Sequence, residues 1–410
     1  MNKLIPIFGI MGVDLFFSIS SILGYQYYGI DDSKVYIIYC IIVAILNLSL
    51  CLGALLLKNL KITLKELLVF SFPFIILSIY LLTGMLNNGF NTLATSFFCY
   101  FLLWSVPAIY VAIYVNKSNI FNSIVKWFEI IMLVFSLSII TSSFIPFLQG
   151  ANFSLMGGAT YQSASYIAAF AFGLNLYFLC FGENHERFNF TSRKIYKYIC
   201  IFLLFLQLSG IFLSGGRGGI ILATAYTIYI SFSILKSRNL NKINTYFLSF
   251  IVFIIFIMIV LPILLQNDIF RSGFDRVFEF ISSDGKINWD GTSNRDDAYL
   301  KAIELISENP IFGYGLYGFW EVSGYPHNII LEILLNGGIT YLIFSTIIFT
   351  VFLNKLFKMI KFDRQNRLLL IIFLYPITML LFSGTYMTNT IFWFVITVVF
   401  TYKNKLQREV

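Results

Sequence analysis

The sequence predicts an all-α polytopic membrane protein, and three observations support this. The chain has 410 residues, of which 58% are hydrophobic and 12% are charged, and its mean hydropathy is +0.82. This much apolar surface indicates that lipid is the solvent for most of the chain. Apolar runs of about 17–25 residues, enough to cross a hydrocarbon core of about 30 Å, recur from end to end. Such long runs favour helices over the short alternating strands of a membrane barrel.

We expect about twelve transmembrane helices, each centred on one of these apolar runs. Their predicted ranges are 4–26, 35–57, 67–84, 92–115, 124–146, 161–181, 198–214, 219–235, 245–265, 327–353, 368–384 and 388–402. The first run is long and lacks a small-residue cleavage site, so it is predicted to be a retained span.

The distribution of Lys and Arg predicts the orientation. With the N-terminus in the cytoplasm, 21 of the 28 Lys and Arg residues fall in cytoplasmic segments and seven on the opposite side. An excess of cations marks cytoplasmic loops. Both termini are therefore predicted to be cytoplasmic. This pattern also accounts for the net charge of +8, and the chain has no basic stripe with interleaved aromatics, so nucleic acid is not an expected partner.

One long segment, residues 266–326, is predicted to lie on the outer side. It carries five cations and ten acids, and a loop of this length is usually functional or disordered. Within "TSNRDDAYLKAIELISENP", Ser293 is a predicted N-cap and apolar residues follow at helical spacing up to Asn309-Pro310. The next stretch, "IFGYGLYGFW", suits the membrane interface. We thus predict helices over 1–265, a large outer loop with a helical segment over 266–326, and the last helices and tail over 327–410, within one integral-membrane domain.

The strongest candidate for chemistry is His327, one of two histidines, which is predicted to open a span from the outer side. Asn328, Glu332, Asn336 and Thr340 follow at intervals of four, so one face of this helix is predicted to stay polar well into the bilayer. A charged group at that depth costs about 2.5–3.5 kcal/mol, so such carboxylates tend to be functional or paired. A neutral imidazole at this position is a reasonable base near pH 7, although an interfacial histidine can also simply be solvated.

Two arginines on the outer side are candidate anion ligands. Arg217 lies in "LSGGRGG", where glycines allow close approach of backbone amides and a guanidinium can bind phosphate in a bidentate way. A flexible turn with a solvated arginine is the alternative. Arg295 lies in the first turn of the outer-loop helix, where it either pairs with a neighbouring Asp or completes an anion site.

The remaining polar residues give weaker signals. Tyr161 and Gln162 are predicted to open the sixth span from the outer side, and Asp14 lies midway along the first. Glu129 is predicted to be interfacial and His185 to have no catalytic role. The five cysteines lie in or at the ends of apolar runs and are predicted to be buried small apolar residues.

Three motifs in order, "SGGRGG", "SNRDDAYLKAIELISENPIFGYGLYGFW" and "PHNIILEILLNGGI", resemble the signature of the O-antigen polymerase and ligase superfamily over residues 205 to 345. "GGATYQSASY" (157–166) is similar to the polymerase branch. The resemblance implies a glycosyltransferase acting on undecaprenyl-pyrophosphate-linked glycans. It implies that Arg217 and Arg295 hold the pyrophosphate and that His327 deprotonates the acceptor hydroxyl. Asn328, Glu332, Tyr161 and Gln162 are further expected substrate-binding residues.

The resemblance further implies a bacterial inner-membrane location with the site facing the periplasm. Lipid-linked oligosaccharides, the bilayer and a chain-length regulator protein are the expected partners. Pyrophosphate is a good leaving group that guanidinium groups stabilise, so no metal or other cofactor is expected.

A polymerase is favoured over a ligase that transfers the glycan to lipid A–core. O-antigen and capsule both stay open as products. A transporter for lipid-linked sugars is the less favoured class, because the polar residues gather at the outer surface rather than at the midplane.

Overall fold

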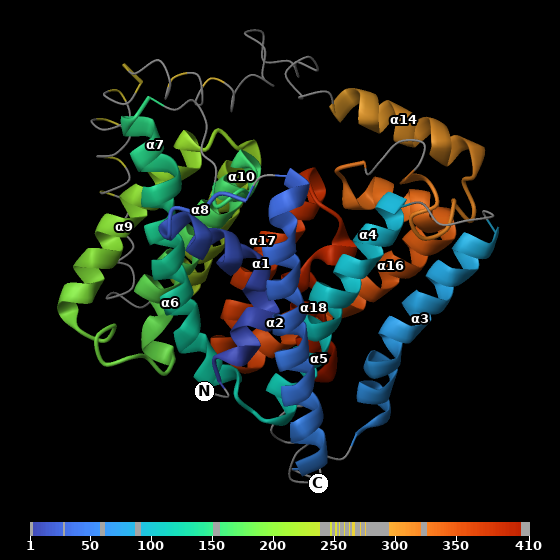
Figure 1. Cartoon of the computed structure of the whole chain (residues 1–410). Coiled ribbons are helices and arrows are strands. Elements are labelled where there is room, and N and C mark those ends of the chain that lie inside the picture. The colour runs from blue at the N-terminus through green and yellow to red at the C-terminus, as the bar shows by residue number, and fades with distance from the viewer. Residues whose placement is uncertain are drawn as a thin grey trace. The chain divides into compact units, whose positions relative to one another are not determined.

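The computed structural model describes residues 3–27, 29–57, 62–86, 92–150, 156–237, 295–320 and 326–402, with isolated positions between 247 and 275. Over these residues the chain is helical (Figure 1). Ten helices are long and apolar enough to cross a membrane, and a shorter apolar helix covers Thr390–Thr401. The fold class predicted from the sequence, an all-α polytopic membrane protein, is confirmed.

The predicted spans coincide with these helices except at one place. The predicted span 245–265 and most of the predicted loop 266–294, including the proposed cap Ser293, lie outside the described residues. The total number of spans therefore stays a prediction, as does the division into spans and one loop within a single membrane domain.

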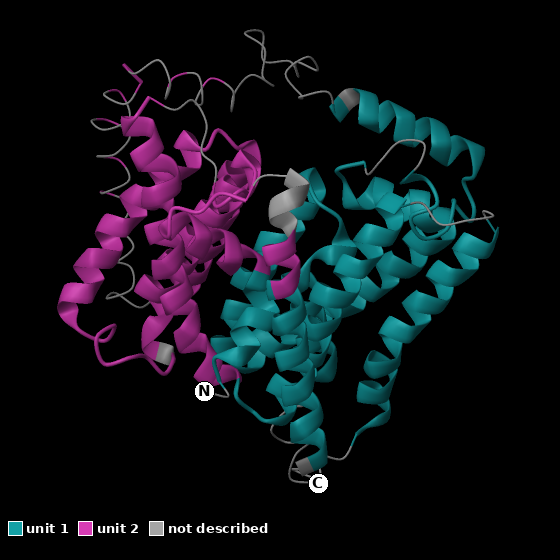
Figure 2. Cartoon of the chain, in the orientation of Figure 1, with its two compact units in different colours: residues 1–12, 39–120, 292–410 teal, residues 13–38, 121–291 magenta. Residues whose placement is uncertain are grey.

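The chain divides into two compact units, coloured in Figure 2. Unit 1 comprises residues 1–12, 39–120 and 292–410, and unit 2 comprises residues 13–38 and 121–291. The boundaries cross α1 (Ile5–Ile22) and α2 (Gly29–Leu57), so both units contain part of each of these helices.

Unit 1 is built from two groups of helices far apart in the sequence. The first group is α3 (Leu64–Leu86), α4 (Thr92–Tyr100), the π-helical turn η1 (Phe101–Ser105) and α5 (Val106–Lys117). The second is α14 (Arg295–Glu308), α16 (Ile329–Phe362), the 3-10 turn η6 (Arg364–Asn366), α17 (Arg367–Phe382), the 3-10 turn η7 (Tyr386–Thr388) and α18 (Thr390–Thr401). The groups are joined by α18, which packs along α5. Asn116 at the end of α5 donates to Val398 O at 2.8 Å and Thr401 Oγ1 at 2.7 Å.

The two ends of unit 1 are held by contacts between different segments of the chain. At one end Lys117 forms an ion pair of 2.9 Å with Glu66, and Lys355 donates to Phe400 O at 2.8 Å. At the other end α14 lies across the helices (Figure 1), and Leu316 N donates to Thr83 Oγ1 at 3.2 Å near the end of α3. Segments predicted to share a side of the membrane thus lie at the same end of this unit.

Unit 2 surrounds a central helix, α8 (Tyr161–Phe181). It packs against α6 (Phe121–Ile139), α9 (Lys194–Leu213) and α10 (Arg217–Ser237). A π-helical turn, η2 (Ile140–Phe144), and the short α7 (Ile145–Leu148) extend α6, and a 3-10 turn, η3 (Gly182–Asn184), follows α8. Nearly every residue of α8 is buried, although its sequence is apolar on all sides, which is the pattern of a helix enclosed by others.

Buried polar side chains link the helices of unit 2. The Asn175 amide donates to Gln207 Oε1 at 2.9 Å, and the Gln207 amide donates to Ser136 Oγ at 2.8 Å. These three residues lie on α8, α9 and α6, and all are buried. Hydrogen bonds of this kind hold membrane helices together, because lipid offers polar groups no partner.

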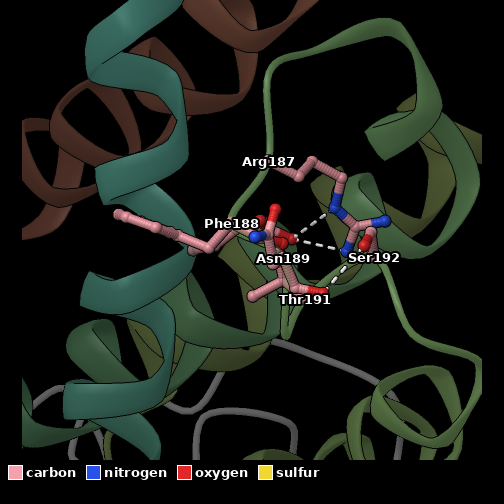
Figure 3. A network of polar contacts seen from close by, with 6 residues as sticks. Arg187, Phe188, Asn189, Thr191 and Ser192 are labelled. Carbon is pink, nitrogen blue, oxygen red and sulfur yellow. Dashed lines mark hydrogen bonds and ion pairs between the residues drawn. The ribbon is translucent and has the colours of Figure 1, made fainter.

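The loop between α8 and α9 is fixed by a buried ion pair. Arg187 donates to Glu129 Oε1 from Nε at 3.0 Å and from Nη2 at 2.6 Å, and the Glu129 side chain is fully buried. Figure 3 shows Arg187 extended beside the turn of Phe188 and Thr191. The Glu129 carboxylate is thus paired inside the protein, and its predicted place at the level of the membrane interface stays a prediction. His185, in the same loop, is bonded at Nε2 to the Tyr177 hydroxyl at 2.7 Å.

The cysteines follow the prediction with one exception. Cys40, Cys51, Cys180 and Cys200 are buried, whereas Cys99 is exposed on α4. The prediction of a buried residue is therefore wrong for Cys99, which lies on an outward face of its helix.

Glu129→Ala is expected to lower the free energy of unfolding of the protein in detergent by about 3 kcal/mol, because it leaves the Arg187 guanidinium beside an apolar interior without its counter-ion. The matched control is Glu186→Ala, which removes an exposed carboxylate in the same loop and should change stability by about 0.5 kcal/mol or less. Denaturant titrations measure both. Equal effects of the two substitutions would contradict a stabilising role for the buried pair.

Candidate functional site

The predicted catalytic histidine lies directly before the cap of α16. The helix begins at Ile329 with Asn328 as its N-cap, so His327 stands outside the helix rather than in its first turn. Its backbone has φ of 53°, the left-handed region that residues other than glycine seldom adopt. Such a conformation persists only where the surroundings enforce it, and it is concentrated at functional sites. The polypeptide therefore fixes the backbone from which this imidazole projects.

Asn328 supplies much of that enforcement. Its Oδ1 accepts hydrogen bonds from Ile330 N at 2.9 Å and Leu331 N at 3.2 Å, which satisfies two free amides of the helix start. Its Nδ2 donates to Leu381 O at 3.2 Å, near the end of α17. The side chain thus ties the start of α16 to a neighbouring helix, one residue away from His327.

The electrostatic surroundings favour the neutral imidazole. His327 is half-buried, and burial lowers its pKa below the ordinary value of about 6.5. The positive charge of Arg295 lowers the pKa of His327 further. Arg295 shares a face of α14 with Ala302 and Leu305, which are buried, and this face is turned toward the unit. His327 and Arg295 both belong to unit 1, and their assignment to one site stays a prediction.

The polar face of α16 meets protein rather than lipid. Glu332 is 1% exposed and accepts hydrogen bonds from the Thr385 hydroxyl and from Tyr386 N, the latter at 3.4 Å. Asn336 Oδ1 accepts from Tyr317 N at 3.0 Å, and its Nδ2 donates to the Tyr386 hydroxyl at 3.2 Å. Both side chains therefore hold the 383–389 connection and the turn at Tyr317 against the helix.

α16 is interrupted after this polar face. Gly337 (φ −152°, ψ 19°) and Gly338 (φ 62°, ψ −160°) have non-helical conformations, so eight residues, 329–336, form a separate first piece. Thr340 lies beyond the interruption and is exposed, and its hydroxyl donates to Ile311 O at 2.9 Å. The prediction of one unbroken polar face running deep into the bilayer is wrong at this last member, because the helix changes direction before it.

The segment after α14 supplies the hydrogen bonds that the interruption removes. Ile339 N donates to Pro310 O at 2.8 Å, and Tyr314 N donates to Leu335 O at 2.8 Å. Gly313 approaches so closely that a Cβ there would lie 2.6 Å from Leu335 O. Unsatisfied backbone groups are costly inside a membrane, so this segment and the break in α16 depend on one another.

The predicted interfacial stretch 311–320 is only partly exposed. Ile311 and Phe312 are exposed, whereas Leu316, Tyr317, Phe319 and Trp320 are buried in unit 1. The ring of Tyr317 packs against those of Trp320 and Tyr80, with centroids 5.2 and 6.4 Å apart. Much of the aromatic content of this stretch therefore forms core rather than interface.

In unit 2 the predicted residues Tyr161, Gln162 and Arg217 come together. α8 begins at Tyr161 and is capped by Thr160, whose Oγ1 accepts from Ser163 N at 3.3 Å. α10 begins at Arg217, and a Cβ on the preceding Gly216 would lie 3.4 Å from Gln162 Cα. The starts of the two helices thus lie side by side, with the Arg217 side chain half-buried.

The glycines around Arg217 have a packing role that sequence reasoning missed. Ser165 donates to Gly216 O at 2.7 Å, and a Cβ on Gly219 would lie 2.1 Å from Ser165 Oγ. A Cβ on Gly218 would lie 2.0 Å from the Tyr166 hydroxyl oxygen. The "GGRGG" turn is therefore pressed against two successive residues of α8, which fixes the position of Arg217.

Thr385, Tyr386 and Ser165 are the residues that the sequence did not reveal. Each lies among other hydroxyl-bearing residues that do not distinguish it, and its partner lies 50 or more positions away. The turn residues Ser383-Gly384 marked a loop near Thr385, but no local pattern connected that loop to Glu332.

Gly218→Ala is expected to destabilise the protein by about 1–3 kcal/mol, because the added methyl overlaps the Tyr166 hydroxyl in a packed interior. Adding Tyr166→Phe removes that oxygen but leaves the ring carbon Cζ, which the Cβ would approach to 2.2 Å, so it should restore little of the loss. Gly53→Ala, at a helical site with open space around it, should be neutral or stabilising by about 1 kcal/mol. Unfolding titrations compare the three variants, and a Gly218→Ala protein as stable as the parent would contradict the close contact.

Comparison with known families agrees with this description. No curated protein matches the chain. Residues 202–346 match the family model described as O-antigen ligase (Wzy_C), and this range includes Arg217, Arg295 and His327. It also agrees with the range over which the three sequence motifs resemble that superfamily. The chain therefore carries a domain of the O-antigen ligase family.

Proposed function

We propose that this protein is a glycan polymerase. It transfers a growing chain from undecaprenyl pyrophosphate to a sugar hydroxyl of an incoming lipid-linked repeat unit of O-antigen or capsule type. Enzymes of the matched family transfer lipid-linked glycans, and the polymerase assignment is our own. The observation that carries the proposal is the half-buried His327, which stands directly before the N-cap of α16 with a left-handed backbone and lies with Arg217 and Arg295 in the matched range.

In the proposed reaction, neutral His327 accepts the proton of the acceptor hydroxyl. The hydroxyl oxygen forms a bond to the anomeric carbon of the donor chain, and the bond between that carbon and the pyrophosphate oxygen breaks. A single displacement of this kind inverts the configuration at the anomeric carbon. Arg217 and Arg295 bind the pyrophosphate and stabilise the negative charge that it gains, which is the usual role of guanidinium groups beside phosphate.

The other predicted residues divide into two kinds in this proposal. Tyr161 and Gln162, beside the turn of Arg217, are assigned to the substrate. Asn328 and Glu332, whose polar atoms already bond to protein, are assigned to holding the first piece of α16 and hence His327. The proposed location is the bacterial inner membrane, with the site on the periplasmic side, both termini in the cytoplasm, and a chain-length regulator as a further partner.

A ligase that passes the chain to lipid A–core is the nearest alternative, because it would use the same residues. A transporter of lipid-linked sugars is favoured by one observation, the interruption of α16, since broken helices are common in transporters. The interruption lies near the start of α16, however, and 24 residues follow it, which span about 36 Å and can cross a bilayer alone. A break at one end of a span suits a surface reaction better than a midplane binding site.

His327→Ala is expected to abolish chain extension, with a loss of at least about a hundredfold, because the general base is removed. His185→Ala is the matched control and should extend chains normally, since His185 lies between α8 and α9, where it is bonded to Tyr177, and outside the matched family range. Purified protein in vesicles with lipid-linked repeat units, read by product ladders on gels, tests both. A His327→Ala protein that still lengthens glycan would exclude this residue as the base.

The same reconstitution separates the classes. A ladder formed without lipid A–core identifies a polymerase, and a single transfer that requires the core identifies a ligase. Movement of labelled lipid across the bilayer without any new glycosidic bond identifies a transporter.

The pH dependence of kcat/KM is expected to reflect the lowered pKa of His327. A base with a lowered pKa stays neutral to more acidic pH, so activity should fall only below about pH 6.5. Arg295→Gln removes the positive charge that lowers this pKa and should move the acid limb to higher pH. Arg295→Lys keeps the charge and should leave the limb in place. An acid limb that is identical in the Gln variant and the parent would contradict the coupling of Arg295 to His327.

A further inference from the structure

The segment Asn309–Trp320 differs from the rest of the outer region in having no charged residue. Glu308 precedes it and Glu321 follows it. Its second half is buried, but Ile311 is 55% exposed and Phe312 is 75% exposed. Two adjacent large apolar side chains are therefore exposed here, in addition to Leu300 and Ile303 on α14.

Hydrogen bonds fix this position to the interruption of α16. Pro310 O and Ile311 O accept from Ile339 N and from the Thr340 hydroxyl at 2.8 and 2.9 Å. A Cβ on Gly338 would lie 2.3 Å from the Ile311 carbonyl carbon, so the two backbones are in direct contact. Ile311 and Phe312 consequently lie at the same level along α16 as its break.

The length of α16 gives the level of that break in the bilayer. Residues 339–354 separate the break from Lys355, and residues 339–357 separate it from Lys358; at about 1.5 Å per residue they extend about 24 and about 28 Å, close to the thickness of a hydrocarbon core. Several apolar side chains on this stretch are exposed and form its lipid-facing surface: Ile339, Ile343, Phe344 and Ile347. The break therefore falls at the outer boundary of the hydrocarbon, where this lipid-facing surface begins.

We propose that Ile311 and Phe312 insert into the acyl chains of the outer leaflet and form a lipid anchor for α14. The anchor continues the lipid-facing surface of α16 outward, and lipid acyl chains are its partner. Tyr314 ties the anchor to α14, because its hydroxyl donates to Leu305 O at 3.1 Å and to Glu308 Oε2 at 2.7 Å. α14, and with it Arg295, is thereby held at the level of the phosphate groups of membrane lipids. This role for Arg295 rests on the proposed function, whereas the insertion itself does not.

The experiment measures depth directly. Nitroxide labels are attached to Phe312→Cys and, separately, Ile311→Cys in protein whose exposed Cys99 is replaced by serine, reconstituted in phosphatidylcholine–phosphatidylglycerol nanodiscs. Ser307→Cys, an exposed position on α14, is the control. At 311 and 312 the label is expected to collide more with dissolved oxygen than with a water-soluble nickel chelate, and at 307 the order should reverse.

Two results would overturn the anchor. Labels at 311 and 312 that collide mainly with the nickel chelate would place them in water. Labels protected from both reagents would show that protein, such as a second copy of the chain, covers them. These readouts need no activity. The anchor can therefore be disproved while His327→Ala still abolishes transfer, and the proposed function can be disproved while the labels still report insertion.

A functional arm tests what the anchor does. Phe312→Asp should lower the rate of chain extension at least fivefold, and Phe312→Leu should retain the parental rate. In the Phe312→Asp protein, a nitroxide at Ile311→Cys reports the depth of the segment, and its accessibility to the nickel chelate should rise. Full activity of Phe312→Asp together with that rise would overturn the role of the anchor in holding Arg295.

Discussion

Backbone amides within a membrane must find their partners inside the protein, and this constraint governs the end of unit 1 at which α14 lies. α16 gives up its own hydrogen bonds at Gly337 and Gly338, and the segment after α14 replaces them. Neither part of the chain could keep its conformation in lipid without the other. The position of α14, and therefore of Arg295 at its start, depends on this exchange between segments that are separated in the sequence.

Polar side chains within the helices have a related role. In unit 2, Gln207 receives a hydrogen bond from one neighbouring helix and donates to another. In unit 1, Glu332 and Asn336 bind the connection between α17 and α18. A carboxylate or amide in an apolar span can therefore have a structural reason, and its presence alone does not identify a substrate contact. His327 differs, because it stands outside its helix with an enforced backbone conformation.

The helical architecture followed from composition, because apolar runs of sufficient length have one stable form in lipid. The start of α8 at Tyr161 was predicted from the extent of an apolar run, and the end of α14 before Asn309 from a local stop pattern; both depend on neighbouring residues only. The break in α16 was not predicted. Two consecutive glycines are compatible with a continuous helix, and the segment that replaces the lost bonds lies about 25 positions upstream. The buried state of Glu129 was missed for the same reason, since its partner Arg187 is remote in sequence.

The interruption of α16 separates a short outer piece from a long inner one, and they need not move together. In a thinner bilayer the long piece can shorten its projection by leaning over, as transmembrane helices generally do. The short piece remains bound through Asn328 to α17 and through Glu332 to the loop at Thr385. The placement of the short piece, and with it of the residue directly before its cap, is therefore set by α17 and the loop at Thr385 rather than by the tilt of the long piece.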